Sequence, residues 1–248
     1  MEITDKKYFM KYNDSTGRKL RGLTNSFLEK NKNLSEEEEE EIFQDLSWHL
    51  WETERKTPLK ETGEDEVVRG ILAYRLMFQK ELNEQNFHEV MYYLSEILKG
   101  PNKKTAAVSY RRVQVAIFNE CGRRIYKPPE PEYVKALMIS FFQQIQSLIQ
   151  EEMSLPEIFY HASLIHLKLF WIHPFVKNNI KAAILIEKWF LAEKLEKTYI
   201  RLPSEKYYFE NKKRYDINTL LGSTYAGIDD GRVLPFLLML PESLKTED

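Results

Sequence analysis

The chain has 248 residues and a formal net charge of −2, and 43% of its residues are hydrophobic. This length allows a sizeable buried core in one large domain or two small ones. The near-neutral charge provides no basic field for nucleic acid or an anionic membrane surface. The single cysteine, Cys121, excludes a disulfide framework within the chain and a cysteine-rich metal site. With no N-terminal signal region and no run of roughly 18 apolar residues, we expect a cytoplasmic protein without a membrane span.

The N-terminal region, residues 1–34, is polar and lysine-rich, which favours an extension that packs loosely or an early hairpin. Ser35 then precedes six glutamates. With Glu38 three residues further on, Ser35 predicts a capping box at the start of a helix. That helix should end near Arg55, because Pro58 cannot continue it.

Further helices are expected before residue 101. Pro58 suits the first position of a helix start at Thr57–Glu61, and apolar periodicity predicts helices at Glu64–Leu82 and Asn86–Leu98. We divide the chain into the N-terminal extension, a helical region at 35–100, and a core with C-terminal helices at 101–248.

One β signal interrupts the helical pattern. Val113–Phe118 and Arg123–Tyr126 alternate around a turn that contains Gly122, which predicts a short hairpin that leans on helices. The remaining helices are expected at residues 133–150, 156–172, 180–195, 204–220 and 233–240. The sequence therefore predicts a mainly α protein, a helical bundle with one short β-hairpin.

The stretch Ile172–Lys181 carries the main functional signal. Pro174 ends one apolar helix, two asparagines follow, and a second apolar helix begins at Ile180. His173 thus lies close to the free N–H groups of a helix start, which places a candidate general base beside a candidate anion site. Taken alone, a helix-end histidine held by the helix dipole is the commoner situation.

The other histidines and the cysteine give no comparable indication of a functional site. The five histidines lack the spacing of a zinc site, and we expect His161 and His166 to be packed or surface residues. No glycine-rich phosphate loop of the Walker or Rossmann type is present. Cys121 has no activating partner in the sequence, so an inert thiol is expected.

His173-Pro174-Phe175, with Asn179 six residues beyond the histidine, resembles the Fic (Fic/Doc) motif H-P-F-x-[D/E]-G-N-G-R-x-x-R. The resemblance extends over roughly residues 45–241. It includes His166, Tyr110-Arg111 and Tyr126-x-Pro128-Pro129 around the hairpin, and the series Ser204, Tyr207, Asn211 and Tyr215.

The resemblance implies an all-helical bundle with a β-hairpin flap, here residues 113–126, that positions a protein target. It implies transfer of AMP from ATP to a Ser, Thr or Tyr hydroxyl, with other phosphate-containing groups moved by some members. In that chemistry His173 removes the proton of the hydroxyl. The expected nucleotide-binding positions are Lys177, Asn178, Asn179, Lys181 and Asn211.

The phosphate side of the motif departs from the family pattern. Lys177 replaces the acidic Mg²⁺ ligand and would repel the metal, so no metal site is predicted. Asn178 replaces the first glycine, while Asn179 is kept. Ile180 replaces the second glycine, which should narrow the anion nest and resist left-handed backbone angles.

The two arginines of the motif are also changed. Lys181 keeps the charge of the first but loses its bidentate fork, and Ile184 removes the second, with its grip on the γ-phosphate. Upstream, Glu52 resembles the glutamate of the family's inhibitory segment, which pairs with that second arginine. Because Ile184 stands where that arginine would be, we give an exposed glutamate at a helix end more weight than a regulatory role.

Two functions follow from the resemblance. The first is a diverged transferase that uses ATP or another nucleotide, in which His173 remains the base and Lys177 and Lys181 replace Mg²⁺ and arginine as counter-charges. The alternative is a catalytically inactive Fic-fold module that binds a protein along the 113–126 hairpin. The sequence leaves the target and the oligomeric state open, and a homo-oligomer is compatible with it.

Overall fold

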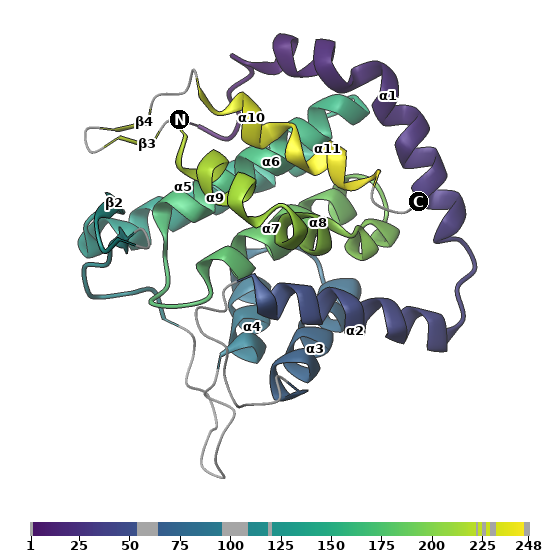
Figure 1. The fold of residues 1–248 in the computed structure, drawn as a ribbon, viewed down its shortest axis with the longest axis horizontal. Coiled ribbons are helices and arrows are strands. Elements are labelled where there is room, and N and C mark those ends of the chain that lie inside the picture. Colours follow the sequence, from purple (N-terminus) through teal and green to yellow (C-terminus); the bar gives the residue numbers. More distant parts are fainter. Residues whose placement is uncertain are drawn as a thin grey trace.

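The computed structural model describes residues 2–53, 64–95, 109–118, 121–221, 223–224, 227–228 and 232–245. Most of these residues are helical, and two short β-hairpins lie at the edge of the helical body (Figure 1). The predicted mainly α bundle with a short hairpin is therefore confirmed. None of the described helices is long and apolar enough to cross a membrane.

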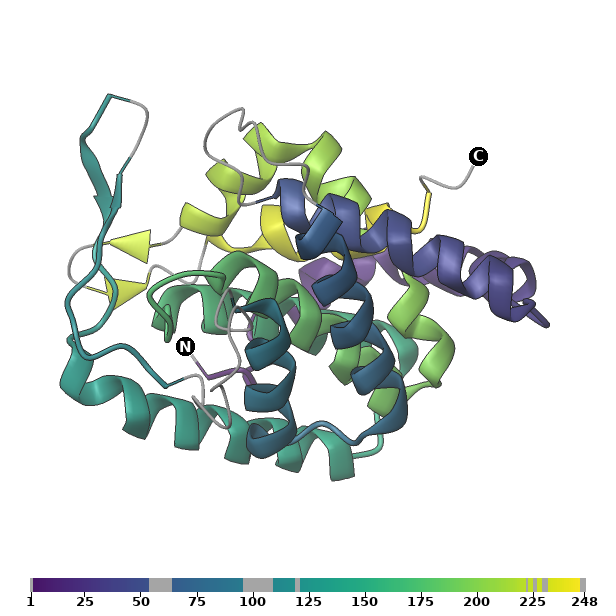
Figure 2. The same ribbon diagram turned by 90° about the horizontal axis from the view of Figure 1, so that it is seen from below.

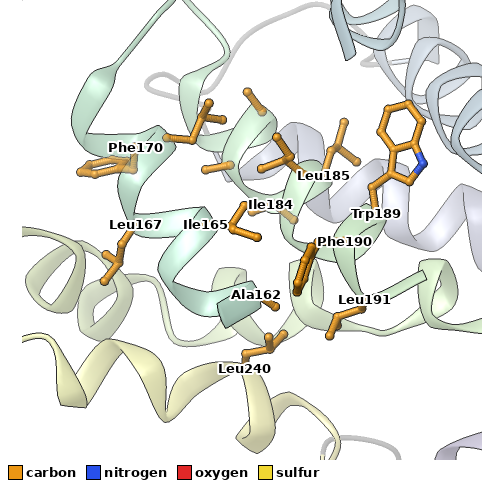
Figure 3. Packing of buried hydrophobic residues seen from close by; sticks show 14 of the residues in the cluster. Ala162, Ile165, Leu167, Phe170, Ile184, Leu185, Trp189, Phe190, Leu191 and Leu240 are labelled. Carbon is orange, nitrogen blue, oxygen red and sulfur yellow. The ribbon is translucent and has the colours of Figure 1, made fainter. Parts of the chain in front are cut away.

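Two helices form the centre of the fold. α6 (Leu155–Ile172) packs along α7 (Asn179–Lys194), and almost every side chain of both helices is buried. A helix that is apolar on all sides belongs inside a core rather than at a surface. Figure 3 shows how side chains of the two helices, among them Ile165 and Ile184, fill the space between them. The loop that joins these helices is thereby held between two rigid elements.

The N-terminal region differs from the expectation. Instead of a loosely packed extension or a hairpin, it forms α1 (Phe9–Lys30), a helix of 22 residues that packs on α6 along the outside of the bundle (Figure 1). Tyr12, Leu20 and Phe27 are buried on one face of α1. Two glycines inside α1 lower its intrinsic helix propensity, so packing against α6 stabilises a helix that local sequence does not favour. The boundaries drawn at residues 35 and 101 stay a prediction.

Three helices cover another side of the core: α2 (Glu36–Glu52), α3 (Glu64–Gln79) and α4 (Glu84–Leu94). The predicted capping box is confirmed, because Ser35 Oγ accepts from Glu38 N at 3.2 Å and Ser35 N donates to Glu38 Oε2 at 2.7 Å. α4 ends earlier than expected, since Ser95 is extended. The predicted helix start at 57–61 lies outside the described residues, as does Arg55.

The predicted hairpin forms, with shorter strands than the sequence suggests. β1 (Ile117–Phe118) pairs antiparallel with β2 (Arg124–Tyr126), and the register shifts within this pair. This hairpin projects from the helical body (Figure 2) and leads into α5 (Pro131–Gln150). A second pair, β3 (Ser223–Thr224) and β4 (Gly227–Ile228), was not expected.

The C-terminal region is more broken than predicted. A 3₁₀ helix, η2 (Lys197–Arg201), follows α7. The single helix expected at 204–220 is two helices, α8 (Ser204–Glu210) and α9 (Lys212–Leu220), which meet at Asn211. The last segment forms α10 (Leu234–Leu237) and α11 (Met239–Ser243), which pack on α6 (Figure 1).

Candidate functional site

The loop between α6 and α7 is built on two residues with left-handed backbone angles. His173 caps α6 at φ 51° and ψ 59°, and Asn178 precedes α7 at φ 64° and ψ 24°. The His173 N–H still donates to Leu169 O at 2.9 Å, which closes the last turn of α6. A left-handed histidine costs roughly 1–2 kcal/mol, so its surroundings must hold it in place.

The His173 side chain is half-buried at the rim of the core. Its Nδ1 lies 3.3 Å from Phe170 O, a carbonyl of the last turn of α6. In the tautomer with hydrogen on Nδ1, this N–H donates a hydrogen bond to the carbonyl oxygen, and Nε2 is the basic nitrogen of the ring. This is the tautomer that a general base needs, because the main chain orients the ring through Nδ1 and the basic nitrogen is Nε2.

Asn179 holds the loop together from inside. Its Oδ1 accepts from Phe175 N at 2.9 Å, and its Nδ2 donates to Phe175 O at 2.9 Å. Phe175 itself is buried, with its ring centre 6.2 Å from that of Phe87 and 5.9 Å from that of Tyr110. The amide of Asn179, predicted to bind nucleotide, is therefore engaged with the main chain of the loop.

Asn178 stands where the motif has a glycine and adopts left-handed backbone angles, which asparagine does more readily than other non-glycine residues. Its Nδ2 donates to Leu94 O at 3.1 Å, which ties the loop to the end of α4. The Asn178 side chain itself makes no capping hydrogen bond to the start of α7. The first N–H groups of a helix have no acceptor within the helix, so such a start can bind an anion.

Ile180 differs from the expectation for its backbone. It lies within the first turn of α7, and its φ is not positive. The resistance of a β-branched residue to left-handed angles therefore does not apply at this position. Its effect on an anion is confined to the bulk of the side chain beside the helix start.

Lys181 is buried and faces α3. Its Nζ lies 3.6 Å from Glu66 Oε2, and the other carboxylate oxygen of Glu66 binds Arg69. Lys177 is exposed on the loop, and Ile184 is completely buried in the core. Of the two lysines predicted to face phosphate, one already has a carboxylate partner inside the protein.

The residues around the loop do not fit Mg²⁺. Lys177 stands at the position of the acidic ligand, and an ammonium group cannot coordinate a cation. Among the described residues, no group of three or more His, Cys, Asp or Glu side chains is placed to hold a metal ion.

Two predicted site residues lie on other elements. Glu52 is the last residue of α2, next to Thr53, whose Oγ1 donates to Leu50 O at 2.7 Å. Asn211 stands between α8 and α9, where its Nδ2 donates to Tyr207 O at 3.0 Å. It lines a cleft of about 490 Å³ whose walls come from α8 and α9: Glu210, Asn211, Lys213, Arg214, Ile217 and Asn218. The structure thus brings together the predicted residues of the α6–α7 loop, with Asn211 on a separate cleft.

His161 and His166 are buried in the core, which is the first of the two expected alternatives, packed or surface residues. His166 Nε2 lies 2.8 Å from Tyr215 OH, and its Nδ1 lies 3.1 Å from Glu187 Oε2. Tyr208 OH also donates to Glu187 at 2.9 Å. Burial raises the pKa of the Glu187 carboxyl, while His166 and the Tyr208 hydroxyl oppose that rise. This buried network supports the two central helices beneath the loop.

Sequence reasoning missed Glu66, the partner of Lys181. In the sequence it is one of three acids in the first turn of α3, and such acids are expected to favour the positive end of a helix dipole. Nothing in that local pattern distinguishes Glu66 from its neighbours. Only the packing of α3 beside α7 identifies it.

The comparisons with known proteins agree with this geometry. Residues 81–191, from before α4 to the last turns of α7, match the profile of the Fic/DOC family. The matched region contains α6, the α6–α7 loop and most of α7. No curated protein matches the chain.

Two solved structures share the fold. A Fic family protein from Desulfovibrio desulfuricans G20 has a TM-score of 0.66 and 16% identity, with 91% of this chain and 72% of that one covered. A Fic domain containing signaling protein from Bacteroides thetaiotaomicron VPI-5482 has a TM-score of 0.62 and 15% identity, with 91% and 94% covered. The resemblance read from the motif is thereby confirmed at the level of family and fold.

Proposed function

We propose that this protein is a diverged Fic-type transferase that moves a phosphate-containing group, AMP from ATP in the simplest case, to a hydroxyl of a protein target. The observation that carries the proposal is the position of His173, one short loop before a helix start that the Asn178 side chain does not cap. A general base and an anion site are thereby held on one rigid turn.

In this reaction the target hydroxyl loses its proton to His173 Nε2 as its oxygen attacks the α-phosphorus of the donor. A new P–O bond forms, the bond to the leaving pyrophosphate breaks, and pyrophosphate carries away the electron pair of that bond. The Phe170 carbonyl stabilises the imidazolium that results, because it accepts a hydrogen bond from Nδ1–H. His173 must then release the proton to solvent before another turnover.

Few positive charges are available to bind the phosphates of the donor. The dipole of α7 and the exposed Lys177 supply positive potential, whereas Lys181 is held by Glu66. Lys177 leaves no acidic ligand for Mg²⁺ on the loop. We therefore expect weak nucleotide binding and slow transfer, in line with altered phosphate chemistry.

The target would bind along the 113–126 hairpin. Val113, Phe118 and Ile125 are exposed there, beside the exposed Arg112. Both strands are short and their outer edges carry main-chain donors and acceptors, so an extended segment of a target can pair with them. The proximity of the hairpin to the end of α6 directs such a segment toward His173.

A specific observation favours the alternative, an inactive protein-binding module. The amide of Asn179 is engaged with Phe175, and the ammonium of Lys181 with Glu66. If neither group is released, little of the motif remains to hold a nucleotide. The hairpin would then bind its partner without any transfer.

One experiment separates the two. The purified protein is incubated with α-³²P-labelled ATP, GTP, CTP or UTP, with and without Mg²⁺, and self-labelling is measured beside thermal unfolding. If the protein transfers the nucleotide, His173→Ala abolishes the labelling and His49→Ala retains it. His49 is the control because it lies on α2, where its imidazole contacts Asp45. A donor at 100 times its dissociation constant should also add about 2.7 kcal/mol of stability. If no donor gives labelling or a change in stability, the transferase proposal is wrong and the inactive binding module is favoured.

A further inference from the structure

The Arg111 guanidinium is buried where the hairpin begins, and it contacts main-chain oxygens. Nε donates to His173 O at 2.7 Å, and Nη2 donates to Ile172 O at 3.4 Å. Nη1 and Nη2 also reach Val113 O at 3.1 Å and Pro129 O at 2.6 Å. Arg111 is only 3% exposed, so these contacts replace its hydration.

The main chain of Arg111 adds a further contact, because its N–H donates to Pro174 O at 2.8 Å. Arg111 therefore binds three consecutive carbonyls, those of Ile172, His173 and Pro174. These oxygens lie on both sides of the Cα atom of His173. Holding them fixes the orientation of the peptide planes on each side of that residue.

The other strand of the hairpin makes a matching contact. The hydroxyl of Tyr126 donates to Trp171 O at 2.7 Å. The last carbonyls of a helix have no intrahelical partner and form the negative end of its dipole. The two sides of the hairpin thus donate to four consecutive carbonyls at the end of α6 and in the loop, through the guanidinium and main-chain N–H of Arg111 and the hydroxyl of Tyr126.

We infer that Arg111, assisted by Tyr126, is a positioning residue that holds His173 in its left-handed conformation and couples its orientation to the hairpin. The inference names the base of the proposed transfer and so rests on that function. Arg111 itself contacts no reacting atom. A planar guanidinium is suited to this task, because its fixed fork reaches several acceptors in one plane, which a lysine ammonium cannot do.

The coupling has a direct consequence for the hairpin. A target segment that pairs with it and shifts β1 or β2 also shifts the donors of Arg111 and Tyr126. Since these donors hold the carbonyls around His173, the imidazole moves with the docked target. Binding of a target and orientation of the base become one event.

The test reads the geometry of His173 without requiring activity. Protein with ¹³C-labelled histidine is prepared as wild type, Arg111→Lys and Tyr126→Phe, with Arg112→Lys, the same change at the exposed neighbour, as the matched control. The imidazole Cε1–Hε1 cross-peak of His173, assigned with His173→Ala, is followed by NMR. The cross-peaks of His161 and His166, buried in the body of α6, report whether the fold is retained.

We expect the His173 cross-peak to shift or broaden in Arg111→Lys and, to a smaller extent, in Tyr126→Phe, with no change in Arg112→Lys. An unchanged His173 cross-peak in a folded Arg111→Lys protein overturns the inference, whether or not the protein transfers nucleotides. If Arg111→Lys does not fold, Tyr126→Phe decides in the same way. Because no donor is added, the outcome is independent of the labelling experiment.

Discussion

The ammonium of Lys181 lies 3.6 Å from the carboxylate of Glu66. The basic residue that α7 retains from the Fic motif is therefore paired with an acid of α3. Glu66→Gln removes that negative charge and leaves Lys181 available to an anion at the start of α7. We expect the dissociation constant for ATP or pyrophosphate to fall several-fold, since an unpaired cation in a buried setting attracts phosphate strongly. Isothermal titration calorimetry measures the change.

Asp65→Asn is the matched control for this prediction. Asp65 lies in the same turn of α3, is exposed, and carries the same charge near the same helix dipole. Its substitution should leave the dissociation constant unchanged. Equal effects of the two variants would mean that a general change of surface potential, and not the release of Lys181, controls anion binding.

The two asparagines of the loop should differ in their effect on stability. Asn179→Ala removes two hydrogen bonds to Phe175 in a buried site, so we expect a loss of about 2–4 kcal/mol in the free energy of unfolding. Asn178→Gly loses one bond to Leu94 O but relieves the left-handed strain, and its effect should stay within about 1 kcal/mol. Urea unfolding of both variants tests this. A larger loss for Asn178→Gly than for Asn179→Ala would contradict these roles.

A pH-dependent contribution to stability is expected at the start of α6. Lys6 and Ser154 lower the pKa of the Glu157 carboxyl from its usual 4.5 to about 2. A carboxyl whose pKa is lowered by folding stabilises the protein above its unfolded-state pKa, and this contribution is lost as the pH falls from about 4.5 toward 2. Glu157→Gln should therefore be less stable than wild type at pH 7, by under about 1 kcal/mol because the pair is partly exposed, and equal to it near pH 2.

Thermal unfolding of wild type and Glu157→Gln between pH 2 and pH 7 measures this contribution. Glu152→Gln, at an exposed position before α6, is the control and should show no such convergence. A difference between wild type and Glu157→Gln that is constant across the range would show that the carboxylate charge is not responsible.

The buried pair of Lys188 and Glu205 should be costly to break singly. Lys188 Nζ lies 2.7 and 2.9 Å from the two oxygens of Glu205, and both side chains are fully buried. Glu205→Gln leaves a buried cation without its counter-charge, so we expect a loss of about 3–5 kcal/mol in the free energy of unfolding. Adding Lys188→Met removes the unpaired cation and should therefore recover part of this loss. The amide oxygen of the new glutamine can still accept from the Tyr74 hydroxyl, which in the wild type donates to Glu205 at 2.6 Å.

A double-mutant cycle of these two substitutions in guanidinium chloride measures the recovery. Additive losses, with the double variant less stable than either single variant, would show that the residues do not act as a pair.

Local signals in the sequence predicted much of this fold. The capping box of Ser35 and Glu38 was found because both partners lie within four residues of each other. The α6–α7 loop was found for the same reason, since its proline and asparagines determine the turn directly. α1 was missed, because its buried residues are few and widely spaced, and only α6 shows which face is covered.

The site was predicted in part for a related physical reason. His173 and Asn179 are close in sequence, so their juxtaposition follows from the loop. Glu66 reaches Lys181 only through the packing of α3 on the core. The acceptors of Arg111 are main-chain carbonyls, which every residue possesses, so no residue type could mark them in advance.

The complete burial of Ile184 limits how phosphate binding could be strengthened by substitution. The Fic motif has an arginine at this position, but here the side chain is enclosed by the packed interior of the two central helices (Figure 3). An arginine introduced there would bring a charge into apolar surroundings, which is strongly destabilising unless the charge is paired. Lys177 is exposed on the loop, so a substitution there involves no such burial. Stronger phosphate binding is therefore reached through the exposed loop and not through position 184.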